Sequence, residues 1–186
     1  MPHVKHEENF RRWFRDSKVV DAAGQPLVVY HGTARTFKSF DPWRTGTNWK
    51  QDKFGIFFSS SPIEAAFSAE RSARRGGAQN IIPVHVNLQN PLILTARRGQ
   101  NVINDFDTFK DEYQRRLING GRDGIISTDG VDTLVVALHS RQIKSSLGNS
   151  GSFDPDSTDI ADYRASNARK ALEFIAARNK NFSPHV

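Results

Sequence analysis

The sequence predicts a single α+β domain built on antiparallel strands. Strand-like and helix-like segments are mixed along the 186 residues, without the regular strand–helix–strand alternation of a doubly wound fold. The chain also lacks a Walker A sequence and a Gly-x-Gly-x-x-Gly motif after a strand, which disfavours P-loop and Rossmann folds. A chain of 186 residues suits one domain with a full core.

Four helices are predicted from apolar residues that recur at three and four positions. They are expected around Phe10–Phe14, from Pro62 to about Arg75, from Phe106 to Leu117, and from about Ala161 to Arg178. The second helix begins with a capping box after Ser61, and we expect Ile63 and Phe67 to form its inward face.

Runs of β-branched and aromatic residues predict the strands. These runs cover residues 27–31, 54–60, 81–88, 92–94, 124–127 and 133–139, and Gln142 and Ile143 are expected to continue the last one. Residues 41–53 have no periodicity and predict a long loop that folds over a site. Residues 148–160 are rich in Gly, Ser, Asp and Pro and predict a polar loop or linker.

Composition and charge exclude several classes of protein. Without cysteine there is no disulfide framework, thiolate nucleophile or Cys-ligated metal centre. The apolar runs are strand-sized, so no membrane helix is expected, and the N-terminus lacks the apolar core of a secretory signal. A net charge of +6 favours anionic partners, although the Lys and Arg residues are scattered. We therefore expect action in the cytosol, without membrane contact.

Two segments each end a hydrophobic strand in small or polar residues. The first is Tyr30-His31-Gly32-Thr33 and the second is Gly55-Ile56-Phe57-Phe58-Ser59. A His followed by Gly offers an imidazole hydrogen bond and lets a flat ligand approach the main chain. Purely structural roles are also open for these residues. A His considered alone, such as His31, is more often structural, and one of Phe57 and Phe58 is expected in the core because they alternate on a strand. Phe67 suits helix packing and ligand stacking equally.

These segments resemble the His-Gly-Ser/Thr and Gly-Ile-Tyr-Phe motifs of ADP-ribosyltransferases with the His-Tyr-Glu type of NAD site. The whole run from about Phe10 to Ile160 is similar to the ADP-ribosyltransferase domain of phage polyvalent proteins and related bacterial toxins. The order and spacing of further short motifs carry this resemblance: Ser17-Lys18-Val19-Val20-Asp21, Asn90-Pro91-Leu92, Asp123-Gly124-Ile125-Ile126, Gln142-Ile143-Lys144-Ser145, and Gly148-Asn149 through Phe153-Asp154-Pro155 to Asp159-Ile160.

The resemblance implies an ADP-ribosyltransferase-like split antiparallel β-sandwich with peripheral helices over residues 1–160. Residues 161–186 would be a C-terminal helical extension, either part of the same compact unit or a partner-binding segment. NAD would lie as cosubstrate in a cleft between two small sheets, where His31 bonds a ribose and the Gly32 main chain holds the nicotinamide amide. Phe57 takes the place of the motif Tyr, and Phe67 that of the stacking ring. The remaining residues implied to contact NAD are Tyr30, Thr33, Phe58 and Ser59.

The carboxylate that stabilises positive charge on the ribose is the point where this sequence departs from the family pattern. Counted from Gln142, Leu134 holds its position, and Asp132 is the nearest carboxylate, although Asp132 also suits a turn after Gly130. Gln142 could orient a ribose hydroxyl but cannot carry the charge. Three interpretations follow: transfer of one ADP-ribose using Asp132 or substrate assistance, an acceptor that brings its own base, or loss of activity.

The function implied is a NAD-dependent mono-ADP-ribosyltransferase that releases nicotinamide, acting as a bacterial or phage toxin or effector in the cytosol of a host or target cell. The open alternatives are a weak or inactive ADP-ribose or nucleic-acid binding module and a NAD hydrolase. RNA 2′-phosphotransfer ranks lower because Phe57 stands where a second His would be needed. No metal is expected, because the leaving group is already cationic. The acceptor is a macromolecule, with protein ahead of RNA or DNA, and a cognate inhibitor or antitoxin is a further expected partner.

Overall fold

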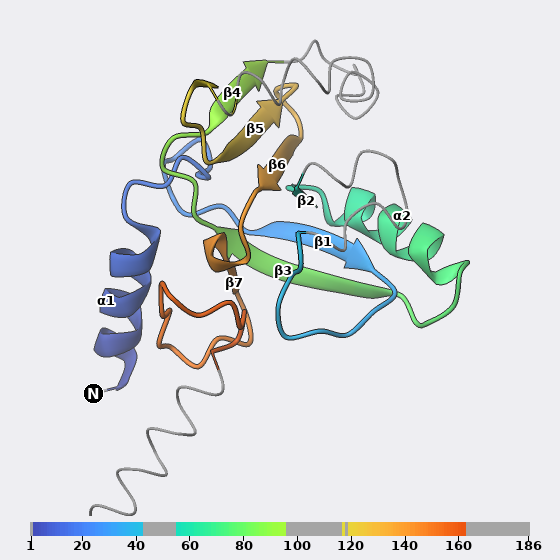
Figure 1. Ribbon diagram of the computed structural model, residues 1–186, viewed down its shortest axis with the longest axis horizontal. Coiled ribbons are helices and arrows are strands. Elements are labelled where there is room, and N and C mark those ends of the chain that lie inside the picture. Colours follow the sequence, from blue (N-terminus) through green and yellow to red (C-terminus); the bar gives the residue numbers. More distant parts are fainter. Residues whose placement is uncertain (1, 43–54, 96–116, 118, 163–186) are drawn as a thin grey trace, which may run out of the picture.

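The computed structural model describes residues 2–42, 55–95, 117 and 119–162 (Figure 1). Three expected elements lie wholly or largely outside these residues: the loop at 41–53, the helix from Phe106 to Leu117, and the helix from about Ala161 to Arg178. Within the described part, α-helices and strands are combined in one sheet-based unit. The α+β class predicted from the sequence is therefore confirmed.

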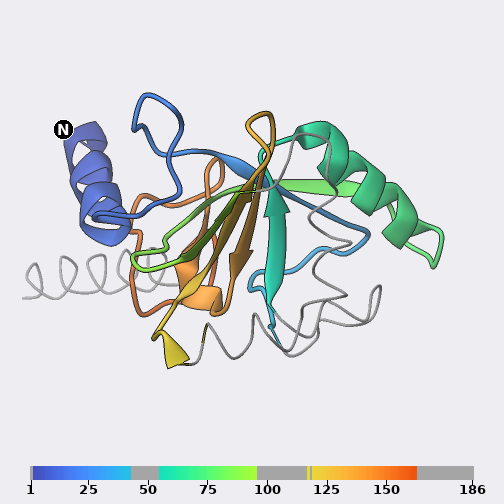
Figure 2. The ribbon, with the colours of Figure 1, turned by 90° about the horizontal axis from the view of Figure 1, so that it is seen from above.

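Seven strands form one hydrogen-bonded sheet in the order β4-β5-β6-β2-β1-β3-β7. Their bounds are Val29–Thr33 (β1), Ile56–Ser59 (β2), Asn80–Val86 (β3), Leu92–Thr95 (β4), Gly124–Thr128 (β5), Thr133–Ala137 (β6) and Ile143–Ser145 (β7). All neighbouring strands are antiparallel except β4 and β5, which are parallel. β1 and β2 pair only through Tyr30 and Ser59, so two halves of the sheet meet there. In Figure 2, the teal β2 runs across the direction of the green β3, in keeping with a split sheet.

The main core covers one face of this sheet. Val29 of β1, Val84 of β3 and Val135 of β6 are fully buried, and Phe58 of β2 is 1% exposed. Alternating residues of a strand point to opposite faces, so the buried set follows the period of two that the sequence of β3 predicts. Phe40, from the segment after β1, closes the same core.

Helix α1 (Pro2–Phe14) packs through the aromatic stripe that the sequence predicts. Trp13 and Phe14 are 3% and 5% exposed, and together with Phe10 they surround Phe153 from the segment after β7. The amide of Asn9 donates to the Gly151 carbonyl at 2.8 Å. Residues distant in sequence are therefore joined at this end of the fold.

Helix α2 (Pro62–Ala73) begins as predicted, with Pro62 in its first turn and the Ser61 hydroxyl accepting from the Glu64 amide at 3.4 Å. The prediction of its inward face is wrong. Ile63 and Phe67 are 65% and 54% exposed, whereas Ala65 and Ala69 are buried. The cause is Gly32 of β1: a Cβ there would overlap the Ala65 carbonyl oxygen and lie 2.7 Å from the Ala69 nitrogen. The helix backbone lies directly on the strand, and only small side chains fit between them.

The expectation that Gln142 and Ile143 extend the preceding strand is also wrong. A short 3-10 turn, Ser140–Gln142, follows β6 and redirects the chain. β7 then pairs with β3 at the far edge of the sheet, with Ile143 opposite Val86. Gln142 stabilises the turn, because its side-chain oxygen accepts from the amides of Leu138 and His139 at 2.9 and 2.8 Å.

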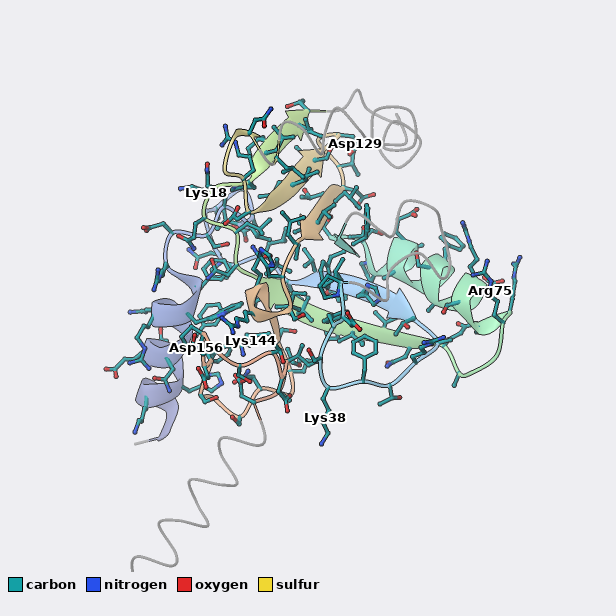
Figure 3. All side chains as sticks on the ribbon, viewed as in Figure 1. Lys18, Lys38, Arg75, Asp129, Lys144 and Asp156 are labelled. Carbon is teal, nitrogen blue, oxygen red and sulfur yellow. The ribbon has the colours of Figure 1, made fainter. Side chains whose placement is uncertain are left out.

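The segment expected to be a polar loop or linker is packed into the domain. Phe153 and Ile160 are buried, and Asp162 is 1% exposed. The fully buried Lys144 ammonium donates to Asp162 Oδ1 and to the Ser157 carbonyl, both at 2.9 Å (Figure 3). The compact unit therefore reaches at least Asp162, two residues past the expected boundary. Within the described residues, no helix is long and apolar enough to cross a membrane.

Candidate active site

His31 lies at the junction of the two halves of the sheet. Its Nδ1 is 2.9 Å from the main-chain oxygen of Phe57. A carbonyl oxygen can only accept, so Nδ1 carries the hydrogen of this bond. In the neutral form of the ring, Nε2 is then the acceptor. The bond thus ties β1 to β2 and sets the tautomer of the imidazole.

Three aromatic rings hold the imidazole in place. Phe40 contacts it edge-on with a centroid distance of 5.0 Å, Phe58 lies at 5.7 Å and Phe37 at 6.4 Å. The motif analysis missed Phe37 and Phe40, although two Phe three residues apart directly after a His-Gly-Thr sequence are a signal for such a wall. Phe58 is almost fully buried beneath the ring. The structure therefore assigns Phe58 to the core and not to a ligand-facing surface.

The main chain of Gly32 faces the junction between β1 and β2. The Pro83 carbonyl accepts from the Ser146 amide on the β7 side, so the main-chain polar groups of Pro83 point away from β1. Tyr30 lies opposite Pro83, and Gly32 lies two residues further along β1. Both residues are therefore at non-hydrogen-bonded positions relative to β3. Their N–H and C=O groups point toward β2, which pairs with β1 at Tyr30 alone.

The register places several candidate residues on the face covered by α2. Tyr30, Ser59 and Leu134 are aligned across β1, β2 and β6 and so share a face, and Gly32 and Phe57 lie two residues from this row. Phe57 is half-buried and packs against Val136 and its apolar neighbours. Phe67 stands on α2 with about half of its surface exposed. Gly32 is covered on this face by the backbone of α2, and Phe67 lies on the part of the helix that does not contact the sheet.

His31 and Thr33 belong to the opposite face. Thr33 is 7% exposed, and its hydroxyl accepts from the Arg35 amide at 3.2 Å. Thr33 therefore organises the turn after β1 and is not a ligand-facing group. His31 touches the Phe57 main chain while the Phe57 side chain points away from Phe58 to the other side of β2. A ligand that meets both residues would have to lie along the strand edge.

The position expected for a carboxylate is occupied by Leu134, between Ser59 of β2 and Ser127 of β5. Asp132 is exposed in the β5–β6 hairpin, close to Asp129, which Figure 3 marks. Its amide donates to Asp129 Oδ1 at 2.9 Å, and its carbonyl accepts from the Thr128 hydroxyl at 3.1 Å. Two hydrogen bonds between Ser60 and Thr133, each 2.8 Å, hold this hairpin against the start of α2.

The side chain of Gln142 stabilises the main chain around the turn that follows β6. Besides accepting from two amides of the turn, it donates through Nε2 to the Asp123 carbonyl at 2.7 Å. It follows the end of β6, whereas Leu134 lies near the beginning of that strand. Because both ends of the amide are engaged with the main chain, we do not include Gln142 among the site residues.

A shifted titratable group lies away from the site, under α1: burial lowers the pKa of His85, while a main-chain hydrogen bond with Leu27 raises it. In the described part of the chain, no three His, Asp or Glu residues are grouped as a metal site requires. The groups available for binding are thus an oriented imidazole, main-chain amides and exposed aromatic rings.

Comparison with known proteins identifies the family. No curated protein and no solved structure matches the chain significantly. The family described as ADP-Ribosyltransferase in polyvalent proteins matches residues 21–153, which include both motif strands and α2. The match confirms the resemblance found in the sequence and agrees with the α+β fold and its split sheet. The chain therefore belongs to the family of ADP-ribosyltransferases in polyvalent proteins.

Proposed function

We propose that this protein transfers a single ADP-ribose from NAD to a macromolecular acceptor, with release of nicotinamide, as a toxin or effector acting in the cytosol. Membership of the family supports ADP-ribosyl transfer in general. The observation that carries the specific proposal is the hydrogen bond between His31 and the Phe57 carbonyl. It orients the imidazole at the point where β1 and β2 stop pairing.

The donor groups at this junction fit NAD. The Nε2 atom of His31 is an acceptor, the role that a ribose hydroxyl needs. The Gly32 main chain points toward β2 with one donor and one acceptor, which match the two ends of a carboxamide. Tyr30 and Ser59 lie on the same face of the sheet as each other, and Phe67 of α2 offers an exposed ring for stacking on a planar heterocycle. When bound, NAD would supply the ADP-ribose and a leaving group that is already cationic.

Asp132 is the residue that we assign to stabilising positive charge on the ribose. Leu134 cannot do so, and Gln142 is held by the main chain. Asp132 is exposed, belongs to a hairpin fixed by side-chain hydrogen bonds, and lies next to the start of α2. A carboxylate displaced from the family position favours transfer of one unit over processive polymer synthesis.

Protein is the acceptor class that we favour. Among the described residues, Asp and Glu slightly outnumber Lys and Arg, so the positive excess of the chain lies outside them. The described surface therefore lacks the strong positive field that nucleic-acid backbones require. A cognate inhibitor or antitoxin that covers the junction would be a second protein partner.

The proposal is tested with NAD labelled in its adenylate part and a whole-cell extract. After incubation, separate aliquots are treated with nuclease and with protease. Label that survives nuclease and is lost with protease is the expected result, and the reverse would make nucleic acid the acceptor. Release of free ADP-ribose without any labelled macromolecule would identify a NAD hydrolase. No turnover at all would support the binding module, which the presence of Leu134 at the carboxylate position favours as the second candidate.

A further inference from the structure

A pocket of about 460 Å³ lies between the end of α1 and the turn that leads to β1. Four apolar residues contribute to it: Phe10, Phe14, Val20 and Pro26. Three cationic residues and one acidic residue lie beside them: Arg11, Arg15, Lys18 and Asp16. Ser17 and Gly24 complete the lining. We call this site the α1 pocket. Its volume lies in the range of pockets that receive an organic group, and its lining is mixed, part apolar and part charged.

The three cationic side chains of the α1 pocket differ in whether they form an ion pair. Arg11 forms an exposed ion pair with Glu7 at 2.6 Å. Arg15 and Lys18 are exposed, and neither forms an ion pair with another described residue. Val20 is 37% exposed beside them. The pocket therefore combines an accessible apolar wall with two available positive charges.

Arg15 has an unusual backbone conformation. Arg15 directly follows α1 with a φ of 50°, a left-handed conformation in which glycine is the usual residue. Its amide donates to the Arg11 carbonyl at 2.8 Å and closes the helix. Arg15 is thus a non-glycine residue in a left-handed conformation at a position that lines the pocket.

The α1 pocket is separate from the NAD site. All of its lining residues except Gly24 and Pro26 precede the part of the chain that matches the family, residues 21–153. Figures 1 and 2 both place α1 and α2 at opposite ends of the sheet. The pocket therefore belongs to a surface that the transfer reaction does not use.

We propose that the α1 pocket binds an acidic segment of a protein partner, which inserts one large apolar side chain between Phe10, Val20 and Pro26. Carboxylates on either side of that side chain would meet Arg15 and Lys18. Glu7 and Asp16 make the surroundings mixed in charge, which opposes a continuous phosphate backbone but allows separate carboxylates to be placed beside the cations. The charge pattern therefore favours an acidic peptide over a nucleic acid.

The test is direct binding of a fluorescein-labelled peptide, Asp-Glu-Leu-Trp-Glu-Asp, to the whole protein, followed by anisotropy without NAD. We expect saturable binding that weakens as salt is added and is lost when the four acidic residues are replaced by their amides. The double variant Arg15→Glu/Lys18→Glu should weaken binding at least about fivefold. Val20→Trp should also weaken it, because the indole fills the pocket without changing the charge.

Two matched variants complete the design. Lys38→Glu makes the charge change of one of these two substitutions at an exposed lysine on another part of the surface, as Figure 3 shows, and should bind like wild type. Arg15→Gly should raise the melting temperature by a few degrees, because glycine suits the backbone, and still lower the affinity. None of these variants should alter nicotinamide release, so the proposal and the transferase function are tested independently.

Three outcomes would overturn the proposal. The first is no peptide binding up to millimolar concentration. The second is equal affinity of the wild-type protein and the pocket variants. The third is binding of a labelled single-stranded oligonucleotide, and not the peptide, in a manner that the pocket variants weaken.

Discussion

The imidazole Nδ1 of His31 and the main-chain oxygen of Phe57 lie 2.9 Å apart, across two strands that otherwise meet in a single residue pair. The bond does two things at once. It joins the two halves of the sheet beside Tyr30 and Ser59, and it leaves Nε2 of the ring as an acceptor. A fold constraint and the group that we propose for ligand binding are thus combined in one side chain.

Gly32→Ala should destabilise the protein severely. The added methyl group would overlap the Ala65 carbonyl, and the helix backbone cannot yield as a flexible side chain would. We expect the free energy of unfolding to fall by more than about 3 kcal/mol, measured by urea denaturation. Gly148→Ala is the matched control, because its nearest contact is the Ser145 hydroxyl at 3.4 Å. Similar losses for the two variants would contradict the close contact between α2 and β1.

Asp132→Asn should slow nicotinamide release by about a hundredfold, the loss of one preorganised electrostatic partner. Asp156→Asn makes the same chemical change at an exposed position far from the hairpin, and it should leave the rate unchanged (Figure 3). Steady-state rates with saturating NAD measure both. If Asp132→Asn retains the wild-type rate, the charge is stabilised by the acceptor or not at all.

Lys144→Met should cost about 3–5 kcal/mol of stability, because it leaves the Asp162 carboxylate buried without its cation. Asp162 would keep only its hydrogen bonds from Asn149 and the Asp154 amide. The comparison is Arg74→Met, which breaks an exposed pair with Glu70 of the same 2.9 Å length and should cost less than about 1 kcal/mol. Equal losses in urea denaturation would show that burial does not set the strength of the Lys144 pair.

Acidification below pH 6.5 should weaken the docking of α1. Burial lowers the pKa of His85. The His85 ring contacts Phe10 with a centroid distance of 4.9 Å, and His85 of β3 lies opposite Lys144 of β7. The unfolded chain then binds a proton more readily than the folded one, so this part of the stability is complete above pH 6.5 and declines as the pH falls toward the folded pKa. The loss of unfolding free energy between pH 7.5 and pH 5.5 should be smaller in His85→Leu. An identical loss in both proteins would remove His85 as a cause.

Local sequence patterns predicted the elements whose buried residues recur at the spacing of a helix or a strand. The stripe of Phe10, Trp13 and Phe14 and the alternation in β3 are such patterns, and the structure contains both. The inward face of α2 could not be predicted from its own sequence, because the closeness of Gly32 excludes Ile63 and Phe67 from the interface. The structural role of Gln142 includes a hydrogen bond to the Asp123 carbonyl, and the two residues come together only when the sheet has formed.

The candidate site shows the same division between local and long-range information. Motifs identified His31 and Gly32, but the orientation of the imidazole follows from its contacts with Phe57, Phe40 and Phe58. The direction of the Gly32 main chain follows from a proline on the neighbouring strand. Sequence motifs could thus propose candidate residues, whereas the geometry of those residues required the pairing of strands that lie far apart in the chain.

The most direct test of the central claim is nicotinamide release from NAD by the wild-type protein and by His31→Phe, with cell extract present. Phenylalanine fits among Phe37, Phe40 and Phe58 but can neither donate to the Phe57 carbonyl nor accept from a ribose hydroxyl. We predict that His31→Phe remains folded, as its melting curve would show, and that release falls about 10- to 100-fold, the loss expected for hydrogen bonds to a bound substrate. The control is His85→Leu, a substitution beneath α1 and away from the site, which should release nicotinamide at the wild-type rate. Wild-type release by a folded His31→Phe protein would contradict the assignment of the NAD site to His31.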